Sequence, residues 1–275
     1  MSGPIAEDGR PIGVFDSGIG GLTVMRALMT RLPGESFVYL GDTARLPYGT
    51  KSADTVRRYA VQAARALMER GVKMVVVACN TASMALPALQ EALAPLPVLG
   101  VIGPGAQAAV AVAPDGPIAV IATEGTVKGG AYRAAIRGLG SDVPIVQQAC
   151  PLFVPLAEEG LTDGPIVEAV IRRYLDPLLA TMPRPKCLLL GCTHYPALKE
   201  AIARIAGADI VLVDSAVTTA AAVAELLASG RIAGDGAPAT LKFLATDAPD
   251  RFARIGEIFL GRPIDPGTVE LIDLQ

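Results

Sequence analysis

The sequence predicts an α/β fold made of two similar halves, each with a mostly parallel sheet and with a functional site in the cleft between them. Short β-branched runs alternate with longer helical patterns along the 275 residues, and parallel strands need such crossover helices. The runs are nearly all apolar, as strands covered on both faces are. The same pattern restarts near the middle of the chain, which predicts the second half.

The first half is expected to alternate strand and helix four times. A glycine, Gly71, ends its longest helix. The predicted strands are residues 12–15, 37–40, 73–78 and 98–102, and the predicted helices are residues 22–31, 53–70, 85–94 and 106–112.

The alternation continues from residue 118 to the end of the chain. A glycine-containing turn joins the first strand of this part to its helix. The predicted strands are residues 118–122, 145–149, 186–190, 210–213 and 240–245, and the predicted helices are residues 130–137, 165–179, 197–206, 216–228 and 250–260.

A weak internal repeat supports two matching halves. Residues 75–81 resemble residues 188–194, because each apolar run ends in a small residue, then a cysteine, then polar residues. Residues 13–18 and 119–125 match in the same loose way. Parallel α/β folds bind ligands at the carboxyl ends of their strands, so both cysteines are expected at such an edge.

The composition excludes several classes of protein. Hydrophobic residues make up 51% and charged residues 19%, which indicates a compact globular chain. The net charge of −3 and the lack of a basic stripe exclude a nucleic-acid surface. Residues 1–10 lack the basic start and apolar run of a signal peptide, and glycines and prolines interrupt the apolar residues 97–122. We therefore expect a cytoplasmic protein with no membrane partner.

Cys79 and Cys192 are the strongest candidates for chemistry. A single cysteine at the end of an apolar strand is usually part of a core. Here two of them occupy matching positions, and each is followed by polar residues. A helix N-terminus after each is expected to lower the thiol pKa. Two thiols on opposite walls suit the inversion of a stereocentre, which needs a base on one face and an acid on the other.

Three polar segments complete the candidate site. His194, the single histidine, lies two residues from Cys192 and is expected either to tune or deprotonate that thiol or to bind substrate. Residues 16–21 form a glycine-rich turn that fits neither a dinucleotide fingerprint nor a P-loop, so Asp16 is expected to bind an ammonium group or to polarise a thiol. In the loop 41–49, Tyr48 and Gly49 are expected to offer a backbone donor to a carboxylate.

The two other cysteines are not expected to react. Cys187 and Cys192 lie near opposite ends of one predicted strand, too far apart to share a zinc ion with His194. Cys150 precedes Pro151 and is interpreted as packing.

These motifs together resemble the glutamate racemases of the aspartate/glutamate racemase superfamily. The resemblance covers nearly the whole chain in order. The matching segments are residues 16–23, 39–45, 47–49, 78–82, 150–156, 191–195 and 214–215.

The resemblance implies two pseudosymmetric α/β domains with the active site between them. The first domain would comprise residues 1–97 and 210–275, and the second residues 98–209. It implies interconversion of L- and D-glutamate for peptidoglycan synthesis, with no cofactor and no metal. A homodimer is expected, and some members of the family also interact with DNA gyrase.

The resemblance also implies roles for individual residues. Cys79 would take the α-proton from D-glutamate with help from Asp16, and Cys192 would take it from L-glutamate with help from His194. Asp42 and Glu158 match supporting carboxylates. The positions that match substrate-binding residues are Asp16, Ser17, Tyr48, Gly49, Asn80, Thr81, Thr193 and His194, with either Thr123 or Thr126 adding a contact.

Two other activities fit the same residues. One is racemisation of aspartate, a hydantoin or another acid that forms a carbanion. The other is hydrolysis by a cysteine nucleophile, which needs one Cys–His pair and leaves Cys79 without a role.

Overall fold

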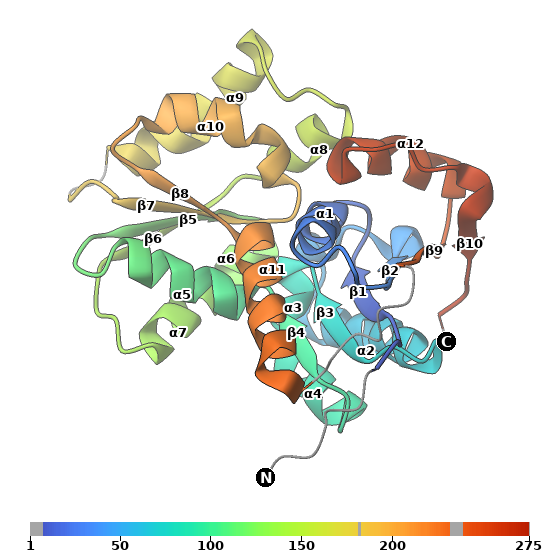
Figure 1. Ribbon diagram of the computed structural model, residues 1–275. Helices are drawn as coiled ribbons and strands as arrows, with labels where there is room; N and C mark the ends of the chain where they lie inside the picture. The colour runs from blue at the N-terminus through green and yellow to red at the C-terminus, as the bar shows by residue number, and fades with distance from the viewer. Residues whose placement is uncertain (1–7, 181–182, 232–238, 275) are drawn as a thin grey trace.

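The computed structural model describes residues 8–180, 183–231 and 239–274, and it contains two parallel sheets (Figure 1). The first sheet has six strands in the order β10-β9-β2-β1-β3-β4, and each neighbouring pair is parallel. Its strands are β1 (Ile12–Asp16), β2 (Phe37–Gly41), β3 (Met74–Val77), β4 (Val98–Gly100), β9 (Leu241–Ala245) and β10 (Val269–Leu271).

The second sheet has four strands in the order β6-β5-β7-β8, again all parallel. Its strands are β5 (Ile118–Ala122), β6 (Ile145–Ala149), β7 (Cys187–Gly191) and β8 (Val211–Asp214). The predicted α/β class with parallel sheets is confirmed.

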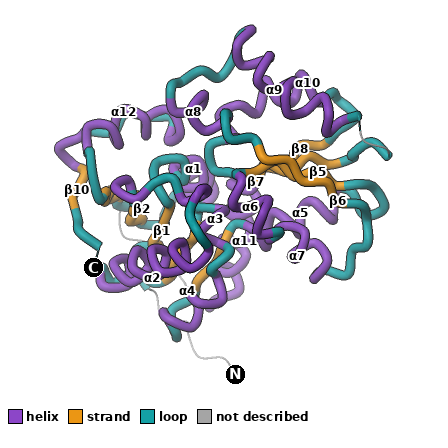
Figure 2. Tube along the Cα trace, turned by 180° about the vertical axis from the view of Figure 1, so that it is seen from behind, coloured by secondary structure: helices purple, strands orange, loops and turns teal. Residues whose placement is uncertain are grey.

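Helices cover both faces of each sheet, which explains why the central strands are apolar throughout (Figure 2). On the six-stranded sheet, one face carries α1 (Leu22–Arg31), α11 (Ser215–Leu226) and α12 (Pro249–Leu260), and the other carries α2 (Ala53–Glu69) and α4 (Leu86–Leu93). On the four-stranded sheet, one face carries α5 (Ile102–Val112) and α7 (Ala131–Gly138), and the other carries α8 (Phe153–Glu158), α9 (Pro165–Leu179) and α10 (Lys199–Ala206).

The chain passes between the sheets at slightly different points from those predicted. β4 pairs with β3 of the six-stranded sheet, although the boundary at residue 98 assigns it to the second domain. β8 pairs with β7 of the four-stranded sheet, although the boundary at residue 210 assigns it to the first. The reason is that β4 pairs with the edge of the sheet that contains the preceding strand β3, and β8 pairs in the same way with the preceding strand β7. The division into two domains stays a prediction. If it holds, β4 belongs to the first domain and β8 to the second.

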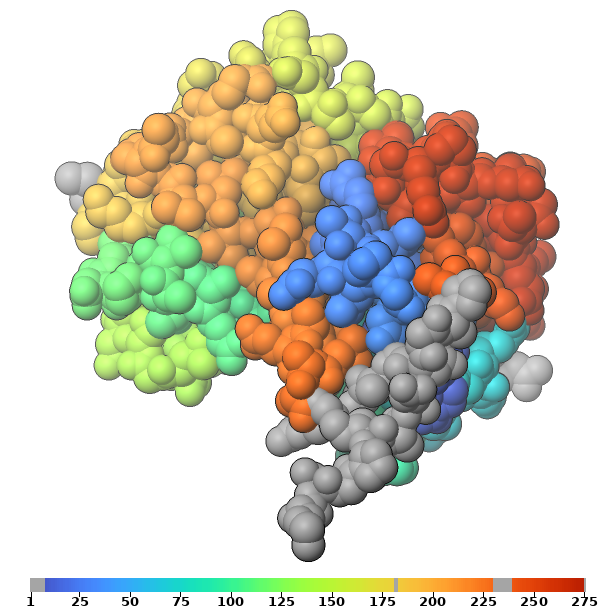
Figure 3. Space-filling view, in the orientation of Figure 1, coloured from blue at the N-terminus to red at the C-terminus, as the bar shows by residue number. Residues whose placement is uncertain are grey.

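The C-terminal part of the chain returns to the six-stranded sheet. On the molecular surface, α1 (blue) lies between α11 (orange) and α12 (red) (Figure 3). Their apolar residues share one core with the sheet. The C-terminal helices α11 and α12 therefore pack against α1, the first helix of the described chain.

Most elements lie within a residue or two of their predicted bounds. α5 is an exception, since it begins at Ile102, where the sequence predicts the end of a strand. Pro104 and the glycines around it suggest a loop, but a proline is compatible with the first turn of a helix. The short elements β10, α3 (Asn80–Ser83), α6 (Glu124–Gly129) and α8 were not predicted.

In the part of the chain that the structure describes, no helix is both long and apolar enough to cross a bilayer. Residues 1–7, which make up most of the segment judged not to be a signal peptide, lie outside the described residues.

Candidate active site

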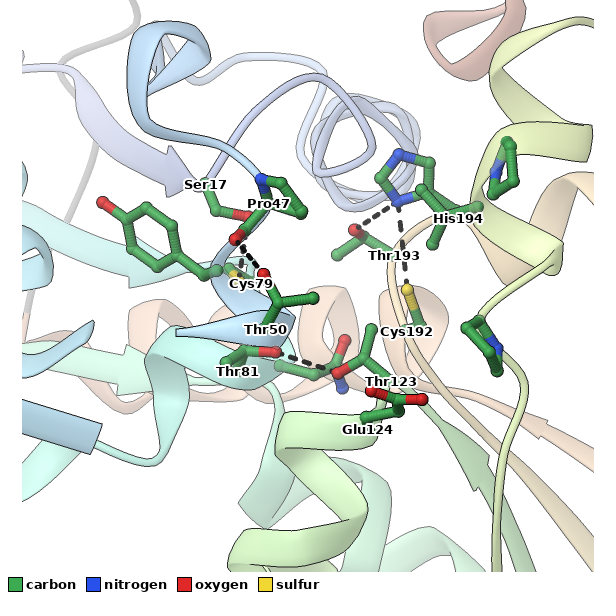
Figure 4. A pocket seen from close by; sticks show the side chains of 16 residues that line it. Ser17, Pro47, Thr50, Cys79, Thr81, Thr123, Glu124, Cys192, Thr193 and His194 are labelled. Atoms are coloured by element: carbon green, nitrogen blue, oxygen red, sulfur yellow. Dashed lines mark hydrogen bonds between the residues drawn. The ribbon is translucent and has the colours of Figure 1, made fainter. Parts of the chain in front are cut away.

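A pocket of about 220 Å³ lies between the two halves, with a cysteine from each half in its lining. Figure 4 shows Cys79 and Ser17 on one side and Cys192 and His194 on the other. Both cysteines follow the carboxyl end of a central strand, β3 or β7, as predicted. The lining consists of Ser17, Pro47, Tyr48, Gly49, Thr50, Cys79, Asn80, Thr81, Thr123, Glu124, Pro151, Val154, Pro155, Cys192, Thr193 and His194.

Cys79 is held by two hydrogen bonds on its wall of the pocket. Its Sγ donates to Ser17 Oγ at 3.3 Å and accepts the backbone N–H of Ala82 at 3.3 Å. The cysteine is the N-cap residue of α3, so its sulfur stands at a helix N-terminus as expected.

The helix N-terminus does not lower the pKa of Cys79. Burial, together with the nearby charge of Asp16, raises the pKa of this thiol to about 12, and the hydrogen bonds with Ser17 and Ala82 only partly oppose this. The expectation of a lowered pKa is therefore wrong for Cys79. The reason is that α3 has four residues and its end is as buried as the sulfur.

Cys192 faces the only histidine. Its Sγ lies 3.9 Å from His194 Nδ1, and Thr193 Oγ1 lies 3.4 Å from the same nitrogen. On the other side of the ring, His194 Nε2 lies 3.1 Å from Glu158 Oε1. Burial works against a charged imidazole, but the hydrogen bonds with Cys192 and Glu158 and their charges raise the pKa of His194. The imidazole of His194 thus lies between a sulfur and a carboxylate, each facing a different ring nitrogen.

Asp16 lies behind the pocket and is not part of its lining. It is buried, and its Oδ2 accepts the N–H of Gly18 at 2.9 Å, whereas its Oδ1 has no hydrogen-bond partner in the part of the chain that the structure describes. Burial raises the pKa of Asp16, although the charge of His194 and nearby backbone N–H groups oppose the rise. The charge of Asp16 is one cause of the raised pKa of Cys79, so Asp16 acts on that thiol electrostatically.

Hydroxyl and amide groups line the floor between the two thiols. Asn80 Nδ2 donates to Tyr132 Oη at 2.7 Å, and the buried Oδ1 of Asn80 has no hydrogen-bond partner among the described residues. Thr81 Oγ1 lies 3.1 Å from Thr123 Oγ1 and 3.2 Å from Thr126 Oγ1. Of these two threonines, Thr123 lines the pocket and Thr126 is buried behind it.

Asp42 lies outside the pocket and both of its carboxylate oxygens are occupied. Oδ2 accepts Tyr48 Oη at 2.5 Å and Arg45 Nε at 2.7 Å, and Oδ1 accepts Thr246 Oγ1 at 3.0 Å. The carboxylate is fully buried. This geometry suits a residue that fixes the loop carrying Tyr48 and not one that transfers protons.

Replacing Asp42 by asparagine is expected to lower the free energy of unfolding by about 2 kcal/mol. The amide keeps the shape but loses charge-assisted hydrogen bonds and leaves the guanidinium of Arg45 without its counter-charge. Urea denaturation measures the change. Asp54→Asn, at an exposed site, is the matched control and is expected to change stability by less than about 0.5 kcal/mol. Equal stability of the two variants would contradict this role.

Some lining residues were not predicted. Pro151, Val154 and Pro155 form an apolar side of the pocket at and near α8, and Pro47, Thr50 and Glu124 also line it. The first three belong to the matched segment 150–156, which was the one signal for them. Cys150 and Cys187 are buried in two different cores outside the lining, and burial raises the pKa of each thiol.

Comparison with known proteins shows the family of the chain. A sequence model of the family described as Asp/Glu/Hydantoin racemase matches residues 12–224. A glutamate racemase of Geobacter metallireducens is 48% identical over 97% of each chain. The structure is similar to that of Francisella tularensis glutamate racemase in complex with D-glutamate, with a TM-score of 0.88 and 38% identity over 96% of this chain and 97% of that one. It is also similar to Escherichia coli glutamate racemase in complex with L-glutamate and an activator, with a TM-score of 0.78 and 29% identity over 97% and 99% of the chains.

The chain has two parallel α/β halves with a thiol on each wall of a shared pocket, and glutamate racemases match it over nearly its whole length, so the protein is an isomerase of the racemase class. Its family match covers most of the chain, and its relatives match it from end to end. The chain belongs to the Asp/Glu/Hydantoin racemase family.

Proposed function

We propose that this chain is a glutamate racemase that interconverts L- and D-glutamate with Cys79 and Cys192 and supplies D-glutamate for peptidoglycan synthesis. The observation that carries the proposal is the position of the two sulfurs on opposite walls of one pocket. The names of its relatives, and the two solved structures that hold D- and L-glutamate, support glutamate as the substrate.

The proposed reaction moves one proton off the α-carbon and another onto its opposite face. One thiolate removes the α-proton, and the thiol on the other wall donates its own proton to the carbanion. Because no PLP delocalises the negative charge in this proposal, hydrogen-bond donors at the substrate carboxylates must offset it. We assign this work to Asn80, Thr81 and Thr193, which line the pocket.

The free pocket favours one direction of proton flow. A raised pKa keeps Cys79 protonated, so it begins as the acid. His194 Nδ1 lies 3.9 Å from Cys192 Sγ, so Cys192 is the thiol with a neighbour that can exchange a proton with it, and in this proposal it begins as the base. With the assignment implied by the resemblance, this state accepts L-glutamate first. After one turnover the two thiols have exchanged roles.

The test is a cofactor-free assay with both enantiomers of glutamate and of aspartate, followed by circular dichroism. Both glutamate enantiomers are expected to racemise completely. Aspartate is one methylene shorter and is expected to react roughly 10- to 200-fold more slowly. Faster turnover of aspartate would favour the aspartate alternative, and a covalent acyl adduct on Cys192 would favour the hydrolase. A homodimer, an interaction with gyrase and a cytoplasmic location stay predictions.

A further inference from the structure

A chain of polar contacts leads from helix α12 to Cys192. Arg251 Nη2 donates to Glu158 Oε2 at 2.7 Å, and Glu158 Oε1 lies 3.1 Å from His194 Nε2. The opposite nitrogen of that ring faces Cys192 Sγ at 3.9 Å. Arg251 belongs to a helix packed on the six-stranded sheet, whereas the other three residues follow strands of the four-stranded sheet.

We propose that Arg251 is a positioning residue, which fixes the carboxylate of Glu158 so that His194 presents Nδ1 to Cys192. One half of the molecule then controls the reactivity of the thiol in the other half. This inference rests on the proposed two-thiol racemisation.

The geometry explains why both carboxylate oxygens matter. The terminal torsion of a glutamate side chain is broad, so one hydrogen bond leaves the carboxylate free to turn. Two partners in different directions, Arg251 and His194, define its plane. Burial raises the pKa of Glu158, but the hydrogen bond with His194 and the charges of His194 and Arg251 lower it overall. Glu158 therefore stays ionised and accepts the Nε2–H of His194. This hydrogen bond fixes the ring so that its other nitrogen, Nδ1, faces the sulfur of Cys192.

Helix α12 contacts the same histidine a second time. The rings of His194 and Phe259 meet edge to face, with centroids 5.0 Å apart and planes at 78°. Figures 1 and 2 both show α8, which ends at Glu158, beside α12. Arg251 thus acts on Nε2 of His194 through Glu158, and Phe259 packs against the imidazole ring and helps to fix its plane.

An ion pair as exposed as this one contributes little to stability. The side chain of Arg251 is 42% exposed, and such pairs are weakened by solvent. We propose that the ion pair serves to orient the carboxylate of Glu158 and contributes little to the stability of the fold. The effect of its removal should therefore appear in catalysis and at Cys192, with a thermal melting temperature close to that of the wild type.

The experiment begins with steady-state kinetics of Arg251→Ala on glutamate. The kcat is expected to fall about tenfold with little change in KM, because the substrate does not contact Arg251 in this proposal. Arg251→Lys keeps a donor and a charge and is expected to recover at least a third of the wild-type kcat. Arg254→Ala, at an exposed position on the same helix, is the control and is expected to leave kcat unchanged. Wild-type kcat in Arg251→Ala would overturn the proposal.

A double-mutant cycle tests whether Arg251 acts by positioning Glu158 or only by stabilising the contact between the two halves. If Arg251 acts through Glu158, Arg251→Ala is expected to cost nothing further in a Glu158→Ala background. A full additional tenfold loss in that background would mean that Arg251 acts elsewhere, and would overturn the proposal.

Thiol labelling gives a readout that needs no turnover of glutamate. Iodoacetamide labelling followed by mass spectrometry of the peptides is expected to show Cys192 reacting at least threefold more slowly in Arg251→Ala, with Cys79 unchanged as internal reference. Equal changes at both thiols, or no change at Cys192, would overturn the role of Arg251. Failure of the proposed function is seen separately, as wild-type protein that labels normally but does not racemise glutamate.

Discussion

Cys79→Ser and Cys192→Ser are each expected to lower the rate of racemisation by roughly 10³-fold. A serine hydroxyl has nearly the size of a thiol but is a far weaker acid, so one face of the substrate loses its proton donor and acceptor. Circular dichroism follows the rate from either enantiomer. Cys150→Ser, in a core outside the pocket, is the matched control and is expected to remain active.

The same variants assign each thiol to one enantiomer when they are studied in D₂O. Cys192→Ser keeps the thiol proposed to act on D-glutamate, so it is expected to exchange the α-proton of D-glutamate faster than it inverts it. Cys79→Ser is expected to exchange L-glutamate in the same manner. Exchange of the same enantiomer by both variants would remove the assignment, and exchange of L-glutamate by Cys192→Ser with D-glutamate by Cys79→Ser would reverse it. Racemisation at the wild-type rate by the double variant would end the two-thiol mechanism.

Gly20→Ala is expected to lower kcat by roughly 10²-fold, although Gly20 does not line the pocket. A Cβ at this position would overlap the imidazole of His194 and stand 2.7 Å from Thr193 Oγ1. The ring must then turn away from Cys192. Steady-state kinetics at saturating glutamate measures the loss.

The control for this variant is Gly103→Ala in α5, where an added Cβ meets no atom within 4 Å. Its kcat is expected to equal that of the wild type. Both proteins should give the same far-ultraviolet circular dichroism, which shows that any loss in Gly20→Ala is local. Full activity of Gly20→Ala would mean that His194 does not need its observed position.

The sequence predicts the sheets well because their central strands are buried on both faces. Residues such as Val75–Val77 are apolar without interruption, so neither their type nor their place is ambiguous. β10 has only three residues and two of them are exposed, so it carries no such pattern. β4 and β8 were identified as strands, but the sheet each joins depends on which edge is open in the folded chain, and local sequence does not contain that information.

The candidate site divides in the same way. Cys79, Cys192 and His194 were visible because chemistry-bearing residues directly follow strands. Glu158 came through the resemblance alone, since it ends a six-residue helix with no local signal. Arg251 and Phe259 could not be predicted from the sequence. Arg251 has no local signal that separates it from other helical arginines, and Phe259 none that separates it from other core aromatics. Their roles depend on the packing of α12 beside α8. The pKa of Cys79 was misjudged because burial depends on the whole fold.

The strand order of the six-stranded sheet has a consequence for how the protein is made. β2 needs β9 as its outer neighbour, and β9 is synthesised after every strand of the four-stranded sheet. On the ribosome, the second half can complete its sheet while the first half still presents β2 as an open edge. Arg251 leaves the ribosome later still. A nascent chain can therefore contain both cysteines before Arg251 reaches Glu158 on the side of the pocket that carries Cys192. Full activity at this site would then be reached only after α12 has been synthesised and has packed beside α8.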